Sequence, residues 1–370
     1  MGMNVRAFAV ALALAVFTGG ATAATAGAVS GTFWGVVPQA TPTSEELVRL
    51  KQGGVDSIRI PFVWSAVQQQ QGGPFDWSGV DSMVGNAADT GLEVLPFLTG
   101  APQWAVAVNH RYQSPQNLPV RTATQRSGWT TFVREAVARY GPTGSFWAEN
   151  PAVPFRPIRN WQIWNEPNFM YFVAKPNPAE YGKLVKLSFS ALRSVDHGAK
   201  LILGGLFSRP AEANLKRRPP LAYFAADFLD KLYRTTPGIQ QKFQGYALHP
   251  YTATFKRLEP YIEEVRDVLK EHHDAGKGLW LTELGWSSQH PTKKNSFAKG
   301  RSGQVTQLRG AFRVIKKRAS KWHVQRVYWF SIDDQRGSCN FCDGSGLFAT
   351  GFKPKPSWRA YVSFAGGTAG

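Results

Sequence analysis

The sequence predicts an α/β fold, a single (β/α)8 barrel, from three observations. Eight short apolar runs recur along the chain, and an amphipathic helical pattern follows each of them. The chain has 370 residues, 43% of them hydrophobic and 18% charged, which is enough apolar material for one large core. Crossovers of this length imply parallel strands, and eight such units favour closure into a barrel. An open doubly wound sheet is the alternative, but no glycine-rich phosphate loop follows the first strand.

The predicted strands are nearly continuous apolar runs, as expected of strands that are buried on both faces. They span residues 32–37, 55–62, 92–98, 158–164, 201–206, 245–249, 279–284 and 324–331. The helical patterns span residues 45–51, 80–90, 129–140, 181–196, 223–234, 260–272, 304–319 and 357–364. The first helix has a clear start, because Thr43 and Glu46 have the spacing of a capping box. Long segments after the third, fifth and eighth strands, at 99–124, 207–220 and 332–354, predict a cleft over one rim of the barrel.

The N-terminus has the features of an export signal. Arg6 precedes an apolar run at 8–17, and small residues follow, so we expect a signal peptide over 1–26 that is cut between residues 23 and 27. The apolar run is too short to span a bilayer, and no later segment is long and apolar enough to do so. The catalytic domain is therefore expected to span 27–370, to be secreted to an extracellular or periplasmic space, and to have no membrane contact after cleavage.

The two cysteines, Cys339 and Cys342, are close in sequence. In an oxidising compartment this spacing favours a local disulfide that closes a very short loop. Two free thiols remain possible. A metal site would need two more ligands, and neither a second CxxC nor an HxxxH pattern supplies them.

The net charge of +18, from 43 Lys and Arg against 25 Asp and Glu, suits an anionic partner such as an acidic polysaccharide, a cell-wall polymer or a nucleic acid. The basic clusters at 216–218, 293–294 and 316–318 are separate, however, and no nucleic-acid-binding motif accompanies them. We therefore expect no nucleic-acid partner. A solvated basic surface explains the same charge without any partner.

The fourth predicted strand ends at a carboxylate. Pro167 follows Glu166, cannot donate to a strand ladder and biases Glu166 towards extended geometry, so the strand should end there. Trp161, Trp164 and Asn165 predict a partly apolar, hydrogen-bonding environment, which would raise the pKa of this carboxyl for acid/base work. The less specific interpretation is a helix-cap partner or a surface charge.

The seventh predicted strand also ends at a single carboxylate, Glu283. Carboxylates are rare in buried strands because a buried charge is costly without a partner. Two opposed carboxylates across a barrel mouth fit glycoside hydrolysis, in which one protonates the leaving oxygen and the other attacks the sugar or activates water.

The two segments resemble the strand-four and strand-seven signatures of a clan of retaining (β/α)8 glycoside hydrolases, which includes the cellulase-like family 5 and the β-xylosidase-like family 39. These segments are WNEPN at 164–168 and TELGW at 282–286. Three further segments resemble other parts of the clan: GVDSIR at 54–59 the second strand, HPY at 249–251 the sixth, and GLF at 346–348 with KP at 355–356 the end of the chain. The resemblance covers essentially the whole mature chain and is slightly closer to family 39.

The resemblance implies a role for each matching residue. Glu166 is expected to be the general acid and then the general base, and Glu283 the nucleophile. Asn165 is expected to hydrogen-bond the sugar 2-hydroxyl in the transition state. These three roles need neither a metal nor an organic cofactor.

Further residues are expected around these groups. Tyr251 and Arg59 should bind Glu283 and keep it ionised, His249 should lie close to the acid/base, and Trp329 should form an apolar platform beneath the sugar. Each also has a purely structural explanation, as an ion-pair partner, a surface residue or part of the core. Four more tryptophans near predicted strand ends are expected either to stack on sugar or to pack in the core: Trp34, Trp64, Trp104 and Trp286.

The leading hypothesis is a secreted retaining O-glycosidase that hydrolyses a β-linked poly- or oligosaccharide by double displacement. It predicts a carboxyl separation of about 5–5.5 Å. A non-catalytic carbohydrate-binding barrel and a transglycosylase are the alternatives that keep the same cleft. A metal-dependent barrel hydrolase is disfavoured, because no His-x-His occurs at the first strand.

Overall fold

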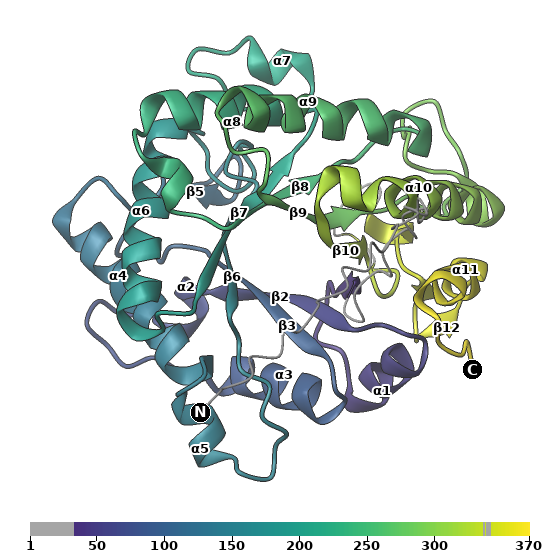
Figure 1. Cartoon of the computed structure of the whole chain (residues 1–370), viewed down its shortest axis with the longest axis horizontal. Coiled ribbons are helices and arrows are strands. Elements are labelled where there is room, and N and C mark those ends of the chain that lie inside the picture. The colour runs from purple at the N-terminus through teal and green to yellow at the C-terminus, as the bar shows by residue number, and fades with distance from the viewer. Residues whose placement is uncertain (1–32, 336, 338–341) are drawn as a thin grey trace, which may run out of the picture.

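The computed structural model describes residues 33–335, 337 and 342–370, and it confirms the single (β/α)8 barrel (Figure 1). Eight parallel strands close in the order β1-β10-β9-β8-β7-β6-β3-β2, and helices surround them. These strands are β1 Trp34–Val37, β2 Ser57–Val63, β3 Glu93–Thr99, β6 Asn160–Asn165, β7 Lys200–Phe207, β8 Gly245–His249, β9 Gly278–Leu284 and β10 Val324–Phe330. All eight fall on predicted strand segments.

The eight predicted helices are also present. They are α1 Ser44–Gln52, α3 Ser78–Asp89, α4 Ala123–Tyr140, α6 Pro178–Val195, α8 Ala225–Thr235, α9 Leu258–Glu271, α10 Gly300–Trp322 and α11 Pro356–Ala365. The capping box of α1 is formed by Thr43 and Glu46, as predicted. The start predicted for α4 was wrong, because a second capping box, made by Thr122 and Gln125, begins this helix well before residue 129.

The loops contain short elements that the sequence patterns did not predict. These are the helices α2 Trp64–Val67, α5 Ser145–Glu149 and α7 Glu212–Leu215, the 3-10 turns η1 Ile239–Gln241, η2 Phe255–Arg257 and η3 Cys342–Gly344, and the strands β4 Val108–Asn109, β5 Ser114–Pro115, β11 Phe348–Ala349 and β12 Lys353–Pro354. The last four form two hairpins, β4 with β5 after β3, and β11 with β12 after β10. They lie in two of the three long segments that follow strands.

The hydrophobic core has two parts. The larger part lies between the strands and the surrounding helices. The smaller part fills the barrel interior and consists of Val37, Leu95, Ile202, Ala247, Trp280 and Tyr328. These side chains fill the interior, so the barrel is a packed core and not a pore. The polar groups of the barrel lie at the carboxyl ends of the strands.

Two predictions lie outside the described residues. The signal peptide at 1–26 is one, and Cys339, the predicted disulfide partner of Cys342, is the other. Export and the disulfide therefore stay predictions. Within the described ranges, no helix combines the length and the apolarity that a membrane span requires.

Candidate functional site

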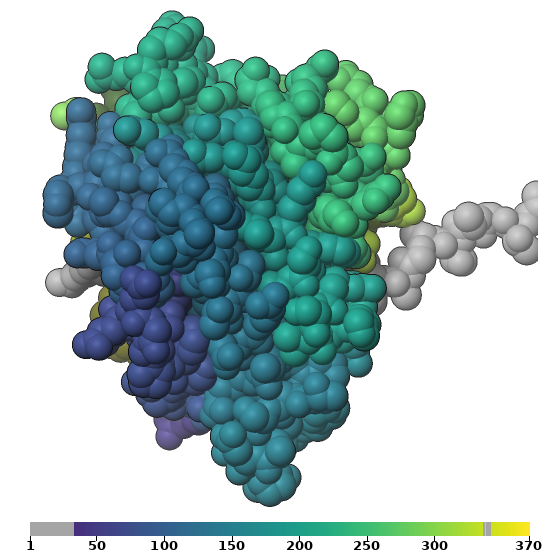
Figure 2. Space-filling view, turned by 90° about the vertical axis from the view of Figure 1, so that its left-hand side faces the viewer, coloured from purple at the N-terminus to yellow at the C-terminus, as the bar shows by residue number. Residues whose placement is uncertain are grey.

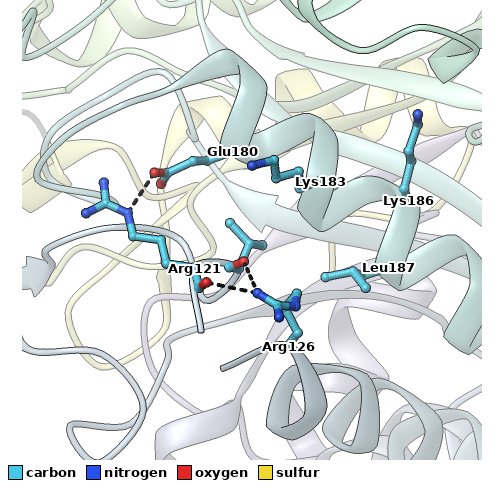
Figure 3. A pocket seen from close by; sticks show the side chains of 7 residues that line it. Arg121, Arg126, Glu180, Lys183, Lys186 and Leu187 are labelled. Carbon is cyan, nitrogen blue, oxygen red and sulfur yellow. Dashed lines mark hydrogen bonds and ion pairs between the residues drawn. The ribbon is translucent and has the colours of Figure 1, made fainter. Parts of the chain in front are cut away.

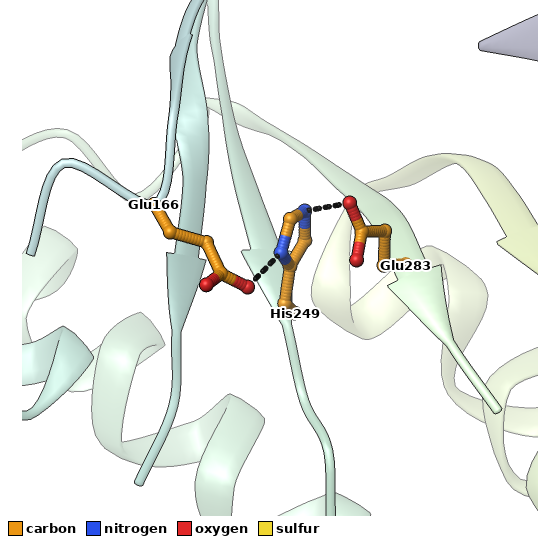
Figure 4. Close-up of side chains that lie close together, drawn as sticks. All are labelled: Glu166, His249 and Glu283. Atoms are coloured by element: carbon orange, nitrogen blue, oxygen red, sulfur yellow. Dashed lines mark hydrogen bonds and ion pairs between the residues drawn. The ribbon is translucent and has the colours of Figure 1, made fainter. Parts of the chain in front are cut away.

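The two glutamates singled out in the sequence meet at one end of the barrel (Figure 4). Glu166 directly follows β6, Glu283 is near the end of β9, and His249, the last residue of β8, lies between them. One carboxylate oxygen of each glutamate and one imidazole nitrogen of His249 lie within 4.8 Å of one another. Glu166 and Glu283 are only 5% and 9% exposed and His249 is completely buried, so the three groups interact in a largely water-free environment.

Arg59 organises one side of this site. It projects from β2, and its guanidinium donates to Oε1 of Glu283 at 2.7 Å, to Oδ1 of Asn165 at 2.6 Å and to Oε1 of Gln162 at 2.7 Å. The guanidinium also lies 4.0 Å from the ring centre of Phe97, a cation–π contact. Because Arg59 is fully buried, these acceptors compensate a charge that would otherwise be costly.

The backbone of β6 allows both amides to reach Arg59. Gln162 and Asn165 are three residues apart, and strict strand alternation would place them on opposite faces. Trp164 has a φ of 68°, in the left-handed region, and this breaks the alternation between them. Its indole packs instead against Trp129 of α4.

The extended geometry predicted for Glu166 was wrong. Its φ is 39°, also in the left-handed region that non-glycine residues seldom adopt. Pro167 does end the strand, but the turn is left-handed, and the Glu166 N–H donates to the carbonyl of Gly205 in β7 at 3.1 Å. Such a backbone costs about 1–3 kcal/mol and persists only where the surroundings enforce it.

His249 connects the acid/base candidate to the rest of the network. Its Nδ1 lies 2.7 Å from Oε1 of Glu166, and its Nε2 lies 3.0 Å from Oγ1 of Thr282. Burial and the charge of Arg59 both lower the pKa of His249 well below its usual value, so the ring is neutral. One of its two nitrogens therefore donates and the other accepts.

The neighbours of Thr282 decide which nitrogen carries the proton. Arg59 donates to Oε1 of Gln162, so the amide NH2 of Gln162 is directed at Oγ1 of Thr282, 3.4 Å away. Thr282 is fully buried, and among the described residues the one acceptor within reach of its hydroxyl is Nε2 of His249. Satisfying that hydroxyl places the imidazole proton on Nδ1, where it is donated to Oε1 of Glu166.

The two carboxyl groups differ in their electrostatic surroundings. Burial raises the pKa of Glu166 well above its usual range, the charge of Glu283 raises it further, and Arg59 lowers it. Burial also raises the pKa of Glu283, but Arg59 and a hydrogen bond from the Tyr251 hydroxyl to Oε2, 2.9 Å long, oppose this effect. Of the two, Glu166 is therefore the carboxyl that retains its proton to higher pH.

A close approach of backbone and ring fixes the position of His249. A Cβ on Gly205 of β7 would overlap the imidazole at Nε2. Only glycine leaves the space that the ring occupies beside β7, with Nε2 in contact with the Thr282 hydroxyl.

A model of the glycosyl hydrolase catalytic core family matches residues 147–361 of the chain. The chain belongs to this family. The matched region contains both glutamates, His249, Tyr251 and Thr282, and it begins after Arg59. Family membership indicates a glycoside hydrolase that acts on a carbohydrate. Among curated proteins, none matches the chain in sequence.

Solved structures with the same fold include glycoside hydrolases of families 39 and 5. A family 39 glycoside hydrolase from the gut symbiont Bacteroides cellulosilyticus WH2 is 19% identical, with a TM-score of 0.62 over 90% of this chain and 63% of that one. A GH39 β-xylosidase from Caulobacter crescentus is 18% identical, with a TM-score of 0.62 over 92% of this chain and 72% of that one. A GH5_18 protein from Bifidobacterium longum subsp. longum, in complex with Manb1-4GlcNAc, is 15% identical, with a TM-score of 0.60 over 90% and 78%. The glycosyl hydrolase spans just under two thirds of the length of the Bacteroides protein. The resemblance to the clan of families 5 and 39, predicted from the sequence, is confirmed.

Trp329 does not lie where the apolar platform was predicted. Trp329 is fully buried, packs on Phe312 of α10 and donates its indole N–H to the Ser345 carbonyl at 3.0 Å, so it faces the helices. The next residue, Phe330, is partly exposed, packs against the interior cluster and lies 6.4 Å from the ring of Tyr251. Neighbouring residues of a strand face opposite sides of the sheet. Trp329 therefore faces the surrounding helices, and Phe330 faces the barrel interior.

The other tryptophans are mostly core residues of the glycosyl hydrolase. Trp34 is at the start of β1, at the opposite end of the strand from the site, and stacks on Phe312 at 4.4 Å. Trp64 and Trp286 are buried and donate their indole N–H groups to Gln68 and Thr252. Trp104 keeps part of its side chain exposed. The placement of the first three favours core packing over sugar contact.

Aromatic residues that the sequence reasoning missed line the site instead. Phe207, the last residue of β7, lies 6.1 Å from Tyr251 and stacks on Phe169 at 4.9 Å. Phe169 in turn contacts Tyr171, which is 55% exposed. A row of rings therefore leads from the buried carboxylates to the surface, although nothing in the local sequence distinguishes these residues from core aromatics.

The same cluster is the one group of metal-ligand side chains found among residues 33–335, 337 and 342–370: Glu166, His249 and Glu283. The Arg59 guanidinium, 2.7 Å from Glu283, places a positive charge beside it. A second cation in the same buried space would be repelled.

Proposed function

We propose that this glycoside hydrolase is an exported enzyme that cleaves a β-linked poly- or oligosaccharide with retention of anomeric configuration. The observation that carries the proposal is a pair of buried carboxyl groups with one oxygen of each within 4.8 Å of the other, of which Glu166 has its pKa raised further than Glu283. Retaining enzymes hold their carboxyl groups about 5–5.5 Å apart, whereas inverting enzymes need about 6.5–9.5 Å to admit a water.

In the first step, Glu283 attacks the anomeric carbon while the bond to the leaving oxygen breaks. Glu166 gives its proton to that oxygen, and a glycosyl ester on Glu283 forms. The high pKa of Glu166 supports its role as the proton donor, because the group is still protonated when Glu283 is ionised.

In the second step, water attacks the anomeric carbon of the ester. The Glu166 carboxylate takes a proton from this water, the bond to Glu283 breaks, and both groups return to their starting states. The loss of the negative charge on Glu283 in the intermediate lowers the pKa of Glu166, since that charge is one of the causes that raise it. The same carboxyl can thus be an acid in one step and a base in the next.

The surroundings of Glu283 suit a nucleophile. Arg59 binds one of its oxygens and Tyr251 the other, which stabilises the ionised form and aligns the carboxylate. Asn165 accepts a hydrogen bond from the same Arg59 guanidinium and lies next to Glu166 in the chain, which supports its proposed role as the partner of the sugar 2-hydroxyl. Phe330 takes the platform role expected of Trp329.

Product analysis tests the proposal directly. The panel contains aryl β-xylosides and β-mannosides first, because two of the similar structures are named for a β-xylosidase and for a complex with Manb1-4GlcNAc. NMR of the first product should show the β-anomer, and an α-anomer as first product would refute retention. Glu166→Ala should slow substrates with poor leaving groups by about 10²–10⁴-fold.

Azide separates the two carboxyl roles. In Glu283→Gly, azide should restore turnover of an activated aryl β-glycoside and give the α-glycosyl azide, because it attacks from the side of the missing nucleophile. In Glu166→Ala it should give the β-glycosyl azide, because it intercepts the ester on Glu283. An exchange of these two products would reverse the assignment of the roles.

A further inference from the structure

A hollow lies on the outside of the barrel, between α4 and α6 (Figure 3). It has a volume of about 680 Å³ and is lined by the first turn of α4, by the first three turns of α6 and by the segment that precedes α4. This is the face of the molecule turned towards the viewer in Figure 2. Its lining contains four basic side chains, one carboxylate and two aliphatic residues.

The charges of this hollow are not balanced. Arg121 is paired with the one carboxylate, Glu180, at 2.7 Å. Arg126 donates to the backbone carbonyls of Val120 and Arg121, and Lys186 donates to the carbonyl of Pro237. Within the described part of the chain, neither these two cations nor Lys183 has a carboxylate partner.

The hollow is close to the rim that holds the catalytic groups. In a (β/α)8 barrel the helices run back from the carboxyl ends of the strands, so their first turns lie at the catalytic rim. Only 166–177 separates the end of β6 from α6, and Glu166 is the first residue of this connection. The same connection therefore joins the catalytic end of β6 to the helix that lines the basic hollow.

We propose that the hollow is an accessory binding site for the carboxylate or sulfate groups of an acidic polysaccharide. The inference rests on the proposed glycosidase function, since it names the class of its substrate. The unpaired cations suit fixed anions, and the net charge of +18 favours association with a polyanion. A single-stranded nucleic acid is disfavoured, because no aromatic side chain lines the hollow to stack on bases.

Binding is tested on the full chain with Glu283→Gln, so that turnover does not interfere. The probes are polygalacturonate, neutral dextran and inorganic sulfate, at low and at physiological salt. The variant Lys183→Gln/Lys186→Gln removes two cations of the hollow. The matched control Lys316→Gln/Lys317→Gln removes the same charge from the exposed face of α10, on another side of the barrel (Figure 1).

The hollow variant should bind polygalacturonate about two- to thirtyfold more weakly, the effect of two exposed ion pairs. The control should change affinity less than twofold, and neither dextran nor sulfate alone should bind comparably. In the active background, both variants should keep wild-type kcat on a neutral aryl glycoside. Lys183→Gln alone, at a side chain with no hydrogen bond in the described structure, excludes an effect of misfolding.

Three results would overturn the inference: no binding of polygalacturonate by the parent protein, equal weakening in the hollow variant and the control, or tighter binding of a DNA oligonucleotide with the same residue dependence. Binding does not require turnover. A protein that binds through the hollow but hydrolyses nothing therefore refutes the catalytic proposal and leaves the accessory site in place.

Discussion

Replacing Thr282 with valine removes one hydroxyl from the site and nearly keeps the shape of the side chain. Nε2 of His249 then loses the donor that lies 3.0 Å away. An unsatisfied buried acceptor costs about 1–3 kcal/mol. The ring escapes this cost if its proton moves from Nδ1 to Nε2, where Oε1 of Glu283 is 3.6 Å away.

The proton of Glu166 is redirected by this change. In the wild type, Nδ1 donates to Oε1 of Glu166, so the acidic proton must be on Oε2, free to reach the glycosidic oxygen. With the proton on Nε2, Nδ1 accepts instead and draws the acidic proton to Oε1, inside the protein. The same range of about 1–3 kcal/mol corresponds to a loss of about 5- to 150-fold in kcat/KM.

The loss should depend on the leaving group. It is expected in full for alkyl glycosides and oligosaccharides, whose leaving oxygen needs a proton, and to be small for aryl glycosides of acidic phenols. Thr282→Ser keeps the hydroxyl and serves as the control. Nitrogen-15 NMR of the His249 ring should find the proton on Nδ1 in the wild type and on Nε2 in the valine variant. A wild-type ring with its proton on Nε2, or an equal loss for both leaving groups, would refute the reasoning.

Three other substitutions have expected outcomes. Tyr251→Phe removes a donor from the carboxylate proposed as nucleophile, so the pKa of that group rises and the acidic limb of kcat/KM should move up by about 1–2 pH units. Gly205→Ala should displace His249 and lower the free energy of unfolding in urea by about 1–3 kcal/mol, whereas the control Gly276→Ala, where a Cβ meets nothing, should not. The folded protein raises the pKa of Glu166, so its ionisation destabilises the fold above the unfolded pKa of about 4.3. Glu166→Gln should therefore raise Tm at pH 7 by on the order of 2–4 °C, a gain that disappears as the pH falls towards 4.

The strands and the two glutamates were accessible from the sequence for a physical reason. A barrel strand is buried on both faces, so a carboxylate such as Glu166 or Glu283 at its end stands out against the apolar run. The parallel topology then brings the ends of distant strands to one rim. Both the fold and the reacting pair therefore follow from local patterns and a count of strands.

The rest of the site depends on contacts that a local pattern does not encode. Gln162 and Thr282 are neutral residues in the middle or near the end of strands, and only their distances across the barrel show that they orient His249. Trp329 and Phe330 are adjacent aromatics, and their sides were exchanged because the sequence pattern did not fix which face of β10 each occupies. The left-handed turn at Trp164 is also invisible in the sequence, since it occurs at a residue that ordinarily avoids it.

The placement of Arg59 has a consequence for how the barrel assembles. Its ionic partner, Glu283, is 224 positions further along the chain. A half-barrel that ends after β6 offers the guanidinium the amides of Gln162 and Asn165 but lacks its ion-pair partner, Glu283. Partial barrels are thereby disfavoured relative to the closed one, and β9 must dock before the interior is electrically neutralised. Arg59, which binds the proposed nucleophile, thus also favours the complete barrel over partial ones.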